Sequence, residues 1–216
     1  MNKIGLKAEW AVISFVSLLL SSCAMSTLMT AQKSFPILDG QQKVQGVDGS
    51  ITISRDAYGV PHIRTETEHD LWFAVGFVHA QDRLYQMDLM RHLGTGRMSE
   101  WFGEDAVAYD AFMQSLGMQQ KFQQAVQRQK HTHVVKAAQA YADGVNAGVA
   151  ALPELPVEYR LLGLEFEKWE PIHSTASTVI NSWVLAQNLP NELVTLMLRE
   201  KLDVANTTAL WKWVPR

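Results

Sequence analysis

The residues that could do chemistry in this 216-residue chain include charged side chains placed within an apolar stretch. Residues 71–93 are mostly apolar, and their charged exceptions include Asp82, Arg83, Asp88 and Arg91. Burying a charge is costly unless an opposite charge lies beside it. We therefore expect structural ion pairs here. We expect His79, in the same stretch, to be a hydrogen-bonded core histidine rather than a catalytic base.

Two other patterns resemble binding motifs but have the wrong context. Residues 94–99 carry two glycines of a dinucleotide-binding loop, but they follow a predicted helix and lack the third glycine. His131 and His133 offer two imidazoles without a third ligand nearby, so they mark a polar break between two helices better than a metal site. Neither pattern predicts a cofactor.

The single cysteine, Cys23, follows a start that is typical of an exported protein. Lys3 and Lys7 precede an apolar run over residues 10–20. A basic start followed by a short apolar run indicates a secretory signal. A membrane span needs roughly 20 apolar residues, so this run is too short to be one.

The four residues that end at the cysteine, Leu20-Ser21-Ser22-Cys23, resemble the bacterial lipobox. In that motif, cleavage exposes a cysteine whose thiol then accepts a lipid. We expect residues 1–22 to be a lipoprotein signal peptide and residues 23–43 to be a solvated tether. The chain would then be exported to the bacterial periplasmic face and anchored to the membrane by lipid. An ordinary signal peptide with an incidental cysteine is the alternative.

The overall composition excludes several classes of protein. The formal net charge is −3, so no basic excess exists for binding the phosphates of nucleic acid. Hydrophobic residues make up 47% and charged residues 19%, which argues against a disordered charged tail. One cysteine excludes a disulfide scaffold and a cysteine-based zinc module.

The elements that must position these residues begin with a predicted hairpin. Apolar residues alternate around Asp48-Gly49 within residues 44–56, and Asp-Gly between such runs favours a hairpin turn. A second turn is expected at residues 58–61, followed by a short strand over residues 62–64.

A long helix is expected from Thr67 to about Leu93. Thr67 and Asp70 fit a capping box at its start, and Gly94 favours its end. Gly76 in its interior costs about 1 kcal/mol relative to alanine, so close packing should compensate for it. Because the helix is apolar almost all round, it should be buried inside something larger than itself.

Helix dominates the rest of the chain. One of these helices should bury a face made of Val134, Ala137, Ala138, Tyr141 and Val145. Residues 44–216 should form one region of the α+β class that is mostly helical. The further helices are expected over residues 119–130, 132–150, 174–187 and 191–203.

Five short strings, which occur in order along the chain, resemble signatures of the penicillin acylase family. The resemblance covers roughly residues 44–203, and the number of matching strings makes chance agreement a weak explanation. The strings are RDAYGVPHI at 55–63, GFVHAQDRL at 76–84, GRMSE at 96–100, YADGVNA at 141–147 and KWEP at 168–171.

The resemblance implies an N-terminal-nucleophile hydrolase, with an αββα sandwich formed by an α and a β subunit cut from one precursor. This chain resembles the α-subunit part only. In the family mechanism, a serine that begins the β subunit attacks the amide, and its own α-amine acts as base. We therefore name no catalytic residue here and expect this chain alone to be inactive. The implied substrate is an N-acyl amide, either a β-lactam or an acyl-homoserine lactone.

The resemblance also implies a structural calcium site. The family takes one α-subunit glutamate downstream of the Trp-Glu-Pro string, and ungapped spacing places it at Glu192. A carboxylate oxygen suits a hard cation. Most other ligands would lie in the β part, so calcium should bind this chain alone weakly. The alternative is that Glu192 binds no ion and that its negative charge stabilises the N-terminal end of a helix through the helix dipole.

The expected helix over residues 174–187 resembles the family segment that lines the acyl pocket. Spacing places Ser182, Leu185 and Ala186 at the lining positions. These side chains are smaller than those of penicillin G acylase, which would leave room for a longer acyl chain. Ordinary helix packing is the alternative explanation.

Two interpretations from other classes stay open. The chain could be a non-catalytic lipoprotein module, or a nonfunctional truncated fragment whose helix over residues 71–93 lacks a partner and aggregates. The leading interpretation expects three partners: a β subunit from the same precursor or a neighbouring gene, a small N-acyl amide, and a membrane reached through the lipid anchor.

Overall fold

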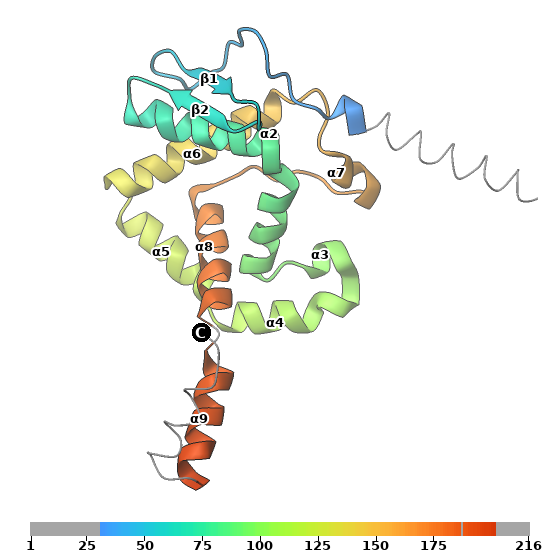
Figure 1. The fold of residues 1–216 in the computed structure, drawn as a ribbon, viewed down its shortest axis with the longest axis vertical. Helices are drawn as coiled ribbons and strands as arrows, with labels where there is room; N and C mark the ends of the chain where they lie inside the picture. The colour runs from blue at the N-terminus through green and yellow to red at the C-terminus, as the bar shows by residue number, and fades with distance from the viewer. Residues whose placement is uncertain (1–30, 187, 202–216) are drawn as a thin grey trace, which may run out of the picture. The chain divides into compact units, whose positions relative to one another are not determined.

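The computed structural model describes residues 31–186 and 188–201, which belong to two compact units. One unit extends to Ser177 and the other begins at Thr178. The described residues are mostly helical, with a small two-stranded sheet (Figure 1). This confirms the expected α+β, mostly helical class. Within the described part, every helix falls short of the length or the apolar character that a membrane span requires.

The sheet is an antiparallel hairpin of β1 (Thr52–Arg55) and β2 (Pro61–Arg64). The carboxylate of Asp56 accepts hydrogen bonds from the backbone N–H groups of Tyr58 and Val60, and these bonds hold the connecting turn. The turn and the short strand that we expected over residues 58–64 are therefore confirmed.

The hairpin turn predicted at Asp48-Gly49 is wrong. The backbone N–H groups of these two residues donate to the carboxylate of Asp70, each at 2.9 Å. A buried side chain from the helix that follows both strands therefore satisfies the donors that a hairpin would have paired across strands. Strand pairing begins only at Thr52, opposite Arg64.

The longest described helix, α2 (Glu68–Thr95), begins as predicted. The Thr67 hydroxyl accepts a hydrogen bond from the backbone N–H of Asp70 at 3.0 Å. Arg83 has non-helical angles, φ −142° and ψ 19°, and the helix changes direction there (Figure 1). The kink divides α2 into an N-terminal arm and a C-terminal arm.

The predicted stop of α2 at Gly94 is wrong. The helix ends at Thr95, and Gly96, which caps it, takes up a left-handed conformation with φ 66°. Gly94 instead lies against Ala176, where a Cβ would come within 2.6 Å of the Ala176 carbonyl oxygen. Residues 94–99 thus join the end of α2 to α3 (Ser99–Phe102), a helix-to-helix connection.

Glycines allow α6 (His133–Ala150) to pack closely against α2. A Cβ on Gly76 would come within 2.1 Å of the Tyr141 carbonyl oxygen, and a Cβ on Gly144 within 1.9 Å of the Phe73 carbonyl oxygen. No larger residue fits at these distances unless the backbones separate. The expectation that close packing accompanies Gly76 is confirmed.

The apolar face predicted for this helix is only partly correct. Val145 is buried, but Val134 is 59% exposed near the N-terminal end of α6. The buried side of α6 is the side with small residues, because α2 and α6 approach too closely there for larger side chains to fit. The buried residues of α6 are Ala140, Ala142, Gly144, Val145 and Gly148.

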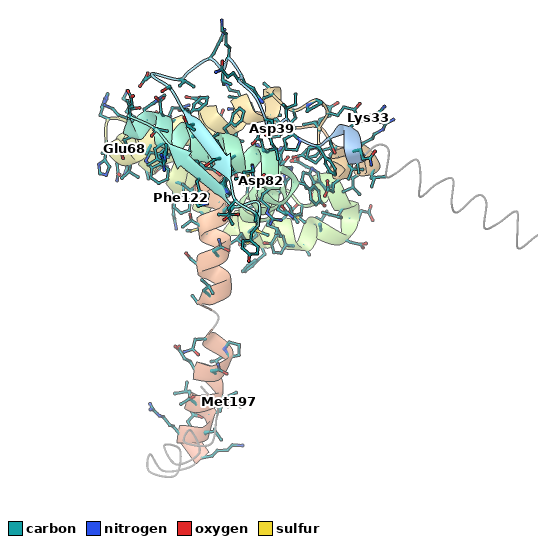
Figure 2. The ribbon with its side chains drawn as sticks, turned by 45° about the horizontal axis from the view of Figure 1, so that its top comes forward. Lys33, Asp39, Glu68, Asp82, Phe122 and Met197 are labelled. Carbon is teal, nitrogen blue, oxygen red and sulfur yellow. The ribbon has the colours of Figure 1, made fainter. Side chains whose placement is uncertain are left out.

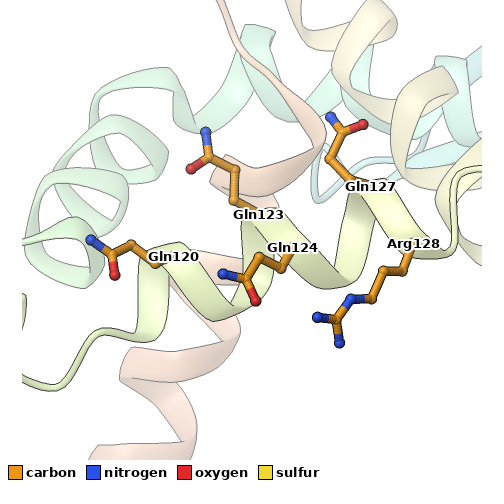
Figure 3. A pocket seen from close by; sticks show the side chains of 5 residues that line it. All are labelled: Gln120, Gln123, Gln124, Gln127 and Arg128. Atoms are coloured by element: carbon orange, nitrogen blue, oxygen red, sulfur yellow. The ribbon is translucent and has the colours of Figure 1, made fainter.

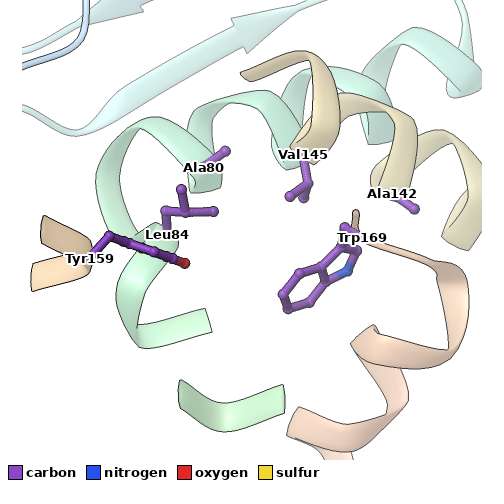
Figure 4. Packing of buried hydrophobic residues seen from close by; sticks show 6 residues of the cluster. All are labelled: Ala80, Leu84, Ala142, Val145, Tyr159 and Trp169. Atoms are coloured by element: carbon purple, nitrogen blue, oxygen red, sulfur yellow. The ribbon is translucent and has the colours of Figure 1, made fainter. Parts of the chain in front are cut away.

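A hydrophobic cluster joins α2 and α6 to α7 (Val157–Leu162) and to the segment before α8 (Figure 4). Its central residues are at most 2% exposed. The helix over residues 71–93 therefore packs against other segments of this chain, unlike the partnerless helix of the truncated-fragment alternative. The cluster consists of Ala80, Leu84, Ala142, Val145, Tyr159 and Trp169.

The sequence patterns did not predict α3, the 3-10 helix η1 (Gly103–Ala106), α4 (Val107–Ser115) or α7. Of the predicted helices, α5 (Met118–Arg128) is confirmed within two residues at each end. Its polar side chains border a shallow surface hollow of about 380 Å³ (Figure 3). All the lining residues come from this one helix, so the hollow is the solvated face of α5. They are Gln120, Gln123, Gln124, Gln127 and Arg128.

Two predicted helices lie near the end of the described chain. The helix α8 (Pro171–Leu185) starts in the first unit and continues into the second, whereas α9 (Leu189–Lys201) lies in the second. Four apolar side chains of α9 are between 49% and 60% exposed. They are Leu193, Val194, Leu196 and Met197.

Candidate functional site

The side chains predicted to line an acyl pocket lie at the C-terminal end of α8. Ser182, Leu185 and Ala186 are three and four residues apart, so they share one side of the helix. The Ala186 N–H donates to the Ser182 carbonyl oxygen at 2.9 Å, which continues the helical pattern. All three residues are exposed, Leu185 to 86%. The structure groups them, and their role in acyl binding stays a prediction.

Glu192, the predicted calcium ligand, is exposed in the first turn of α9. Its Oε1 accepts a hydrogen bond from the Asn188 side-chain amide at 3.2 Å. The Asn188 amide oxygen in turn accepts from the Asn191 side chain at 3.3 Å. Carboxylate and amide oxygens are ligands that calcium prefers, so the oxygen atoms of these side chains suit the ion. The same position also suits the helix-dipole alternative.

The predicted lipidation site, Cys23, lies outside the described residues, as do the predicted signal peptide and the first part of the tether. These assignments stay predictions.

Asp88 and Arg91 of α2 form a buried ion pair, as expected for charges on this helix. Both side chains are fully buried, and Arg91 Nε donates to Asp88 Oδ1 at 2.8 Å. The Tyr159 hydroxyl donates to Asp88 Oδ2 at 2.7 Å, and His92 Nδ1 lies 3.2 Å from Oδ1. Burial raises the pKa of the Asp88 carboxyl. The His92 hydrogen bond, the Arg91 charge and the Tyr159 hydrogen bond outweigh it and lower that pKa.

Arg91 also connects α2 to the segment that leads into α8. Its Nη1 donates to the Glu167 carbonyl oxygen at 2.9 Å and lies 3.4 Å from His173 Nδ1. The guanidinium carbon lies 5.7 Å from the centroid of the Phe166 ring and 5.1 Å from that of Trp169. Such cation–π contacts stabilise a buried cation. The ion pair therefore joins three segments that are distant in sequence.

The other two charged residues predicted within residues 71–93, Asp82 and Arg83, lie nearer the surface. Asp82 pairs with Arg55 of β1 through two hydrogen bonds of 2.9 Å, so this pair connects the hairpin to the helix. Figure 2 labels Asp82 on the hairpin side of α2. Arg83 is exposed at the kink, where the structure gives it no buried ion pair.

The prediction that His79 is a core histidine is wrong in its location. The residue is exposed, and its Nδ1 lies 3.0 Å from the hydroxyl of Tyr141. Its hydrogen bond was expected, but its side chain lies outside the buried contact between α2 and α6. Burial raises the pKa of its partner, Tyr141, to about 12.

Two further buried carboxylates hold loop backbone in place. Asp70 accepts the two loop N–H groups described above. Asp110 of α4 accepts the N–H groups of Met98 and Ser99, at 2.8 and 2.7 Å, where α3 begins. Burial raises the pKa of both carboxyls, but the hydrogen bonds that they accept outweigh it and lower the pKa. These residues fix loops to helices.

Among the described residues, one group of imidazole and carboxylate side chains approaches the spacing of a metal site. His69 Nδ1 lies 3.4 Å from Asp48 and 3.3 Å from Asp70. Both oxygens of Asp70 already accept backbone hydrogen bonds, which explains the group without an ion. His131 lies between α5 and α6, and His133 is the first residue of α6; both are exposed, at the polar break where we expected them.

Sequence reasoning missed three members of the buried network, His92, Tyr159 and His173. Tyr159 lies 71 residues from the carboxylate that it contacts, and no local pattern connects the two positions. One signal was available for His173. Proline is common in the first turn of helices, so Pro171 could have placed His173 in the first turn of α8.

Comparison with known proteins identifies similar chains. A penicillin acylase 2 proenzyme from Pseudomonas sp. strain SE83 is 41% identical over 145 residues, which cover 67% of this chain and 19% of that protein. The acyl-homoserine lactone acylase QuiP of Pseudomonas aeruginosa is 35% identical over 170 residues, covering 78% and 20%. This chain therefore spans about a fifth of the length of these curated relatives.

The fold and the family model agree with these relatives. A thermostable penicillin G acylase from Alcaligenes faecalis shares the fold, with a TM-score of 0.54 and 24% identity over 77% of this chain and 93% of that chain. The family model described as penicillin amidase matches residues 50–215. On this match and on the relatives together, the chain belongs to the penicillin amidase family.

Proposed function

We propose that this chain is the α-subunit part of an amide hydrolase that cleaves N-acyl substrates. The observation that carries the proposal is the family match over residues 50–215. The names of two relatives, a penicillin acylase and an acyl-homoserine lactone acylase, suggest the two substrate classes. Because this chain spans about a fifth of their length, the nucleophile is expected in a β part outside it.

In the proposed reaction, the serine that begins the β subunit attacks the amide carbonyl, and its own α-amine takes the proton. An α-amine has an ordinary pKa of about 8, which suits this role at neutral pH. Hydrogen-bond donors of the β part stabilise the oxyanion. The amine then leaves, and water hydrolyses the acyl-enzyme. The α part contributes binding surface for the acyl group and for the β subunit.

On this chain, acyl binding falls to the end of α8. Ser182, Leu185 and Ala186 share one side of that helix and are exposed in this chain by itself. Their modest side chains favour an extended aliphatic acyl group. We therefore propose an acyl-homoserine lactone with a long chain in preference to a phenylacetyl amide.

The test compares the purified 216-residue chain with the protein made from the complete gene. Each is incubated with N-decanoyl-homoserine lactone and with a phenylacetyl amide, and the released primary amine is measured. We expect release by the complete protein, faster from the lactone, and none above the blank from the chain alone. Release of amine by the chain alone would contradict the proposal that the nucleophile lies in a β part outside this chain. A processed complete protein that releases no amine from either substrate would reject the hydrolase.

We also propose that Glu192 supplies one carboxylate to a structural calcium ion shared with the β part. Calorimetry of the complete protein should show weaker calcium binding, by roughly tenfold or more, for Glu192→Ala, because a charged ligand is lost. Glu200→Ala, also on α9, is the matched control and should leave the affinity unchanged. Equal affinities for both variants would assign Glu192 to the helix dipole alone.

We also propose that Cys23 is the residue to which a lipid is attached, and that this lipid anchors the protein on the periplasmic side of a bacterial membrane. Mass spectrometry of the mature N-terminal peptide should show a lipid-modified cysteine. Cys23→Ser should move the protein from the membrane fraction to the soluble fraction. An unmodified cysteine in the mature protein would reject the anchor and leave the hydrolase proposal intact.

A further inference from the structure

His173, in the first turn of α8, presents its Nδ1 to two hydrogen-bond donors. The Glu170 backbone N–H donates to this nitrogen at 2.9 Å, and Arg91 Nη1 lies 3.4 Å away. Neither group can accept a hydrogen bond. The nitrogen must therefore carry its lone pair, so the imidazole is neutral and has its proton on Nε2.

The side chain of His173 lies in a site that disfavours a positive charge. The residue is 7% exposed, and the buried Arg91 cation faces it from α2. Asp88 of α2, whose negative charge favours a protonated imidazole, already pairs with Arg91. The ring of Trp169 packs edge-on against the imidazole at 5.6 Å between centroids and adds no opposing charge.

Two further charged groups act on this site, and they also form a pair. Glu167, in the segment before α8, favours a protonated imidazole, whereas Arg97, just after α2, disfavours it. Arg97 Nη1 donates to the Glu167 carboxylate at 2.7 Å, so neither charge is free to act on the imidazole alone. The negative charges around His173 are thus engaged elsewhere.

We propose that His173 is an acid-released latch between α2 and the first turn of α8. A proton on Nδ1 would meet the Glu170 N–H and the Arg91 guanidinium as a third donor, so the closed contact must open to admit it. The two helices touch close by, because Gly94 lies against the backbone of Ala176. Opening would therefore separate α8 from the C-terminal arm of α2 and from the Arg91 network.

The direction of the pH dependence follows from the two states. Burial, then the charge of Arg91, lowers the pKa of His173 to about 4 in the closed state. An exposed imidazole has a pKa of about 6.5. Between these values only the open state binds the proton, so the closed state loses stability as the pH falls. From pH 7 to pH 5 the ratio of open to closed should rise about twentyfold.

Hydrogen exchange of the complete protein, made from the complete gene, tests the latch. Peptides that cover residues 170–177 are followed at pH 7 and pH 5, and the rates are corrected for intrinsic exchange. We expect opening to increase about twentyfold in the wild type. His173→Asn keeps a neutral acceptor that does not titrate, so its opening should change little. Peptides from residues 140–148 of α6 report the core and should stay protected.

Three results would overturn the latch. The first is an equal acid response in the wild type and His173→Asn. The second is an equal rise of exchange in α6, which would indicate global unfolding. The third needs no variant: histidine-selective NMR of the wild-type protein should give His173 a titration midpoint well below pH 6.5, and a midpoint near pH 6.5 contradicts the proposal.

A second variant, His173→Asp, places a carboxylate beside Arg91. This carboxylate should pair with Arg91 and keep residues 170–177 closed at pH 5.

Discussion

At the scale of single residues, this chain depends on buried charges whose partners come from distant segments. Asp88 has Arg91 one helical turn away, but Tyr159 reaches it from α7. Burial and the Asp88 charge together raise the pKa of the Tyr159 hydroxyl, which therefore stays protonated and donates. A buried charge is tolerable only when each of its oxygens has such a partner.

We predict that Tyr159→Phe destabilises the protein by roughly 2–3 kcal/mol at pH 7, because Asp88 Oδ2 loses the donor that binds it. Urea unfolding of the variant and the wild type measures the difference. Tyr58→Phe is the control, since Tyr58 is 93% exposed and should change stability by less than about 0.5 kcal/mol.

The cost of Tyr159→Phe should also depend on pH. The hydrogen bond helps to lower the pKa of Asp88, so its contribution is complete above the ordinary aspartate pKa of about 4. It disappears as the pH falls through the lowered pKa, where Asp88 takes up a proton. A difference in stability that grows on acidification would contradict this assignment.

At the scale of elements, the contact between α2 and α6 organises the first unit. The two helices approach so closely at Gly76 and Gly144 that backbone meets backbone. This contact holds the N-terminal arm of α2, before the kink at Arg83, whereas the C-terminal arm carries the Arg91 network that receives α8.

We predict that Gly144→Ala costs about 3 kcal/mol or more, because the new methyl group would collide with the Phe73 carbonyl oxygen. The midpoint of urea unfolding should fall accordingly. Gly163→Ala is the contrasting control. Gly163 has φ 66° and open space around it, so only backbone strain of about 1–2 kcal/mol applies. Equal losses in the two variants would mean that α2 and α6 can move apart freely.

At the scale of the whole molecule, the first unit has an internal core, whereas α9 of the second unit exposes a row of apolar side chains. Monomeric proteins rarely expose large continuous apolar surfaces. Within a protein about five times longer, as the relatives are, such a row would be available for contact with the additional chain.

We predict that the isolated 216-residue chain self-associates and that Leu196→Lys with Met197→Lys restores the monomer. These side chains are 56% and 60% exposed. Size exclusion with light scattering at several protein concentrations measures the mass. Leu161→Lys on α7, where the leucine is 64% exposed, is the control and should not change association. If the wild-type chain is monomeric at all concentrations, the exposed apolar side chains of α9 do not drive self-association.

The elements that the sequence predicted correctly are those whose signals are local. The Thr67 cap, the turn at residues 58–61 and the bounds of α5 and α6 depend on hydrogen bonds and periodicity within a few residues. The short helices α3, α4 and α7 carry too few residues for such a pattern to appear. The expected roles of Ser182, Leu185, Ala186 and Glu192 came from the family resemblance, because exposed side chains on a helix have no local signature of their own.

Sequence by itself determined the family, the helical class and the presence of charges that needed partners. Only the tertiary structure decided which partners they found. Asp70 satisfies the loop that looked like a hairpin, Gly94 packs against α8 while Gly96 ends α2, and His173 lies against Arg91. The physical reason is range: caps and periodicity act within about one helical turn, whereas partners for buried charges and close backbone contacts depend on segments brought together by folding.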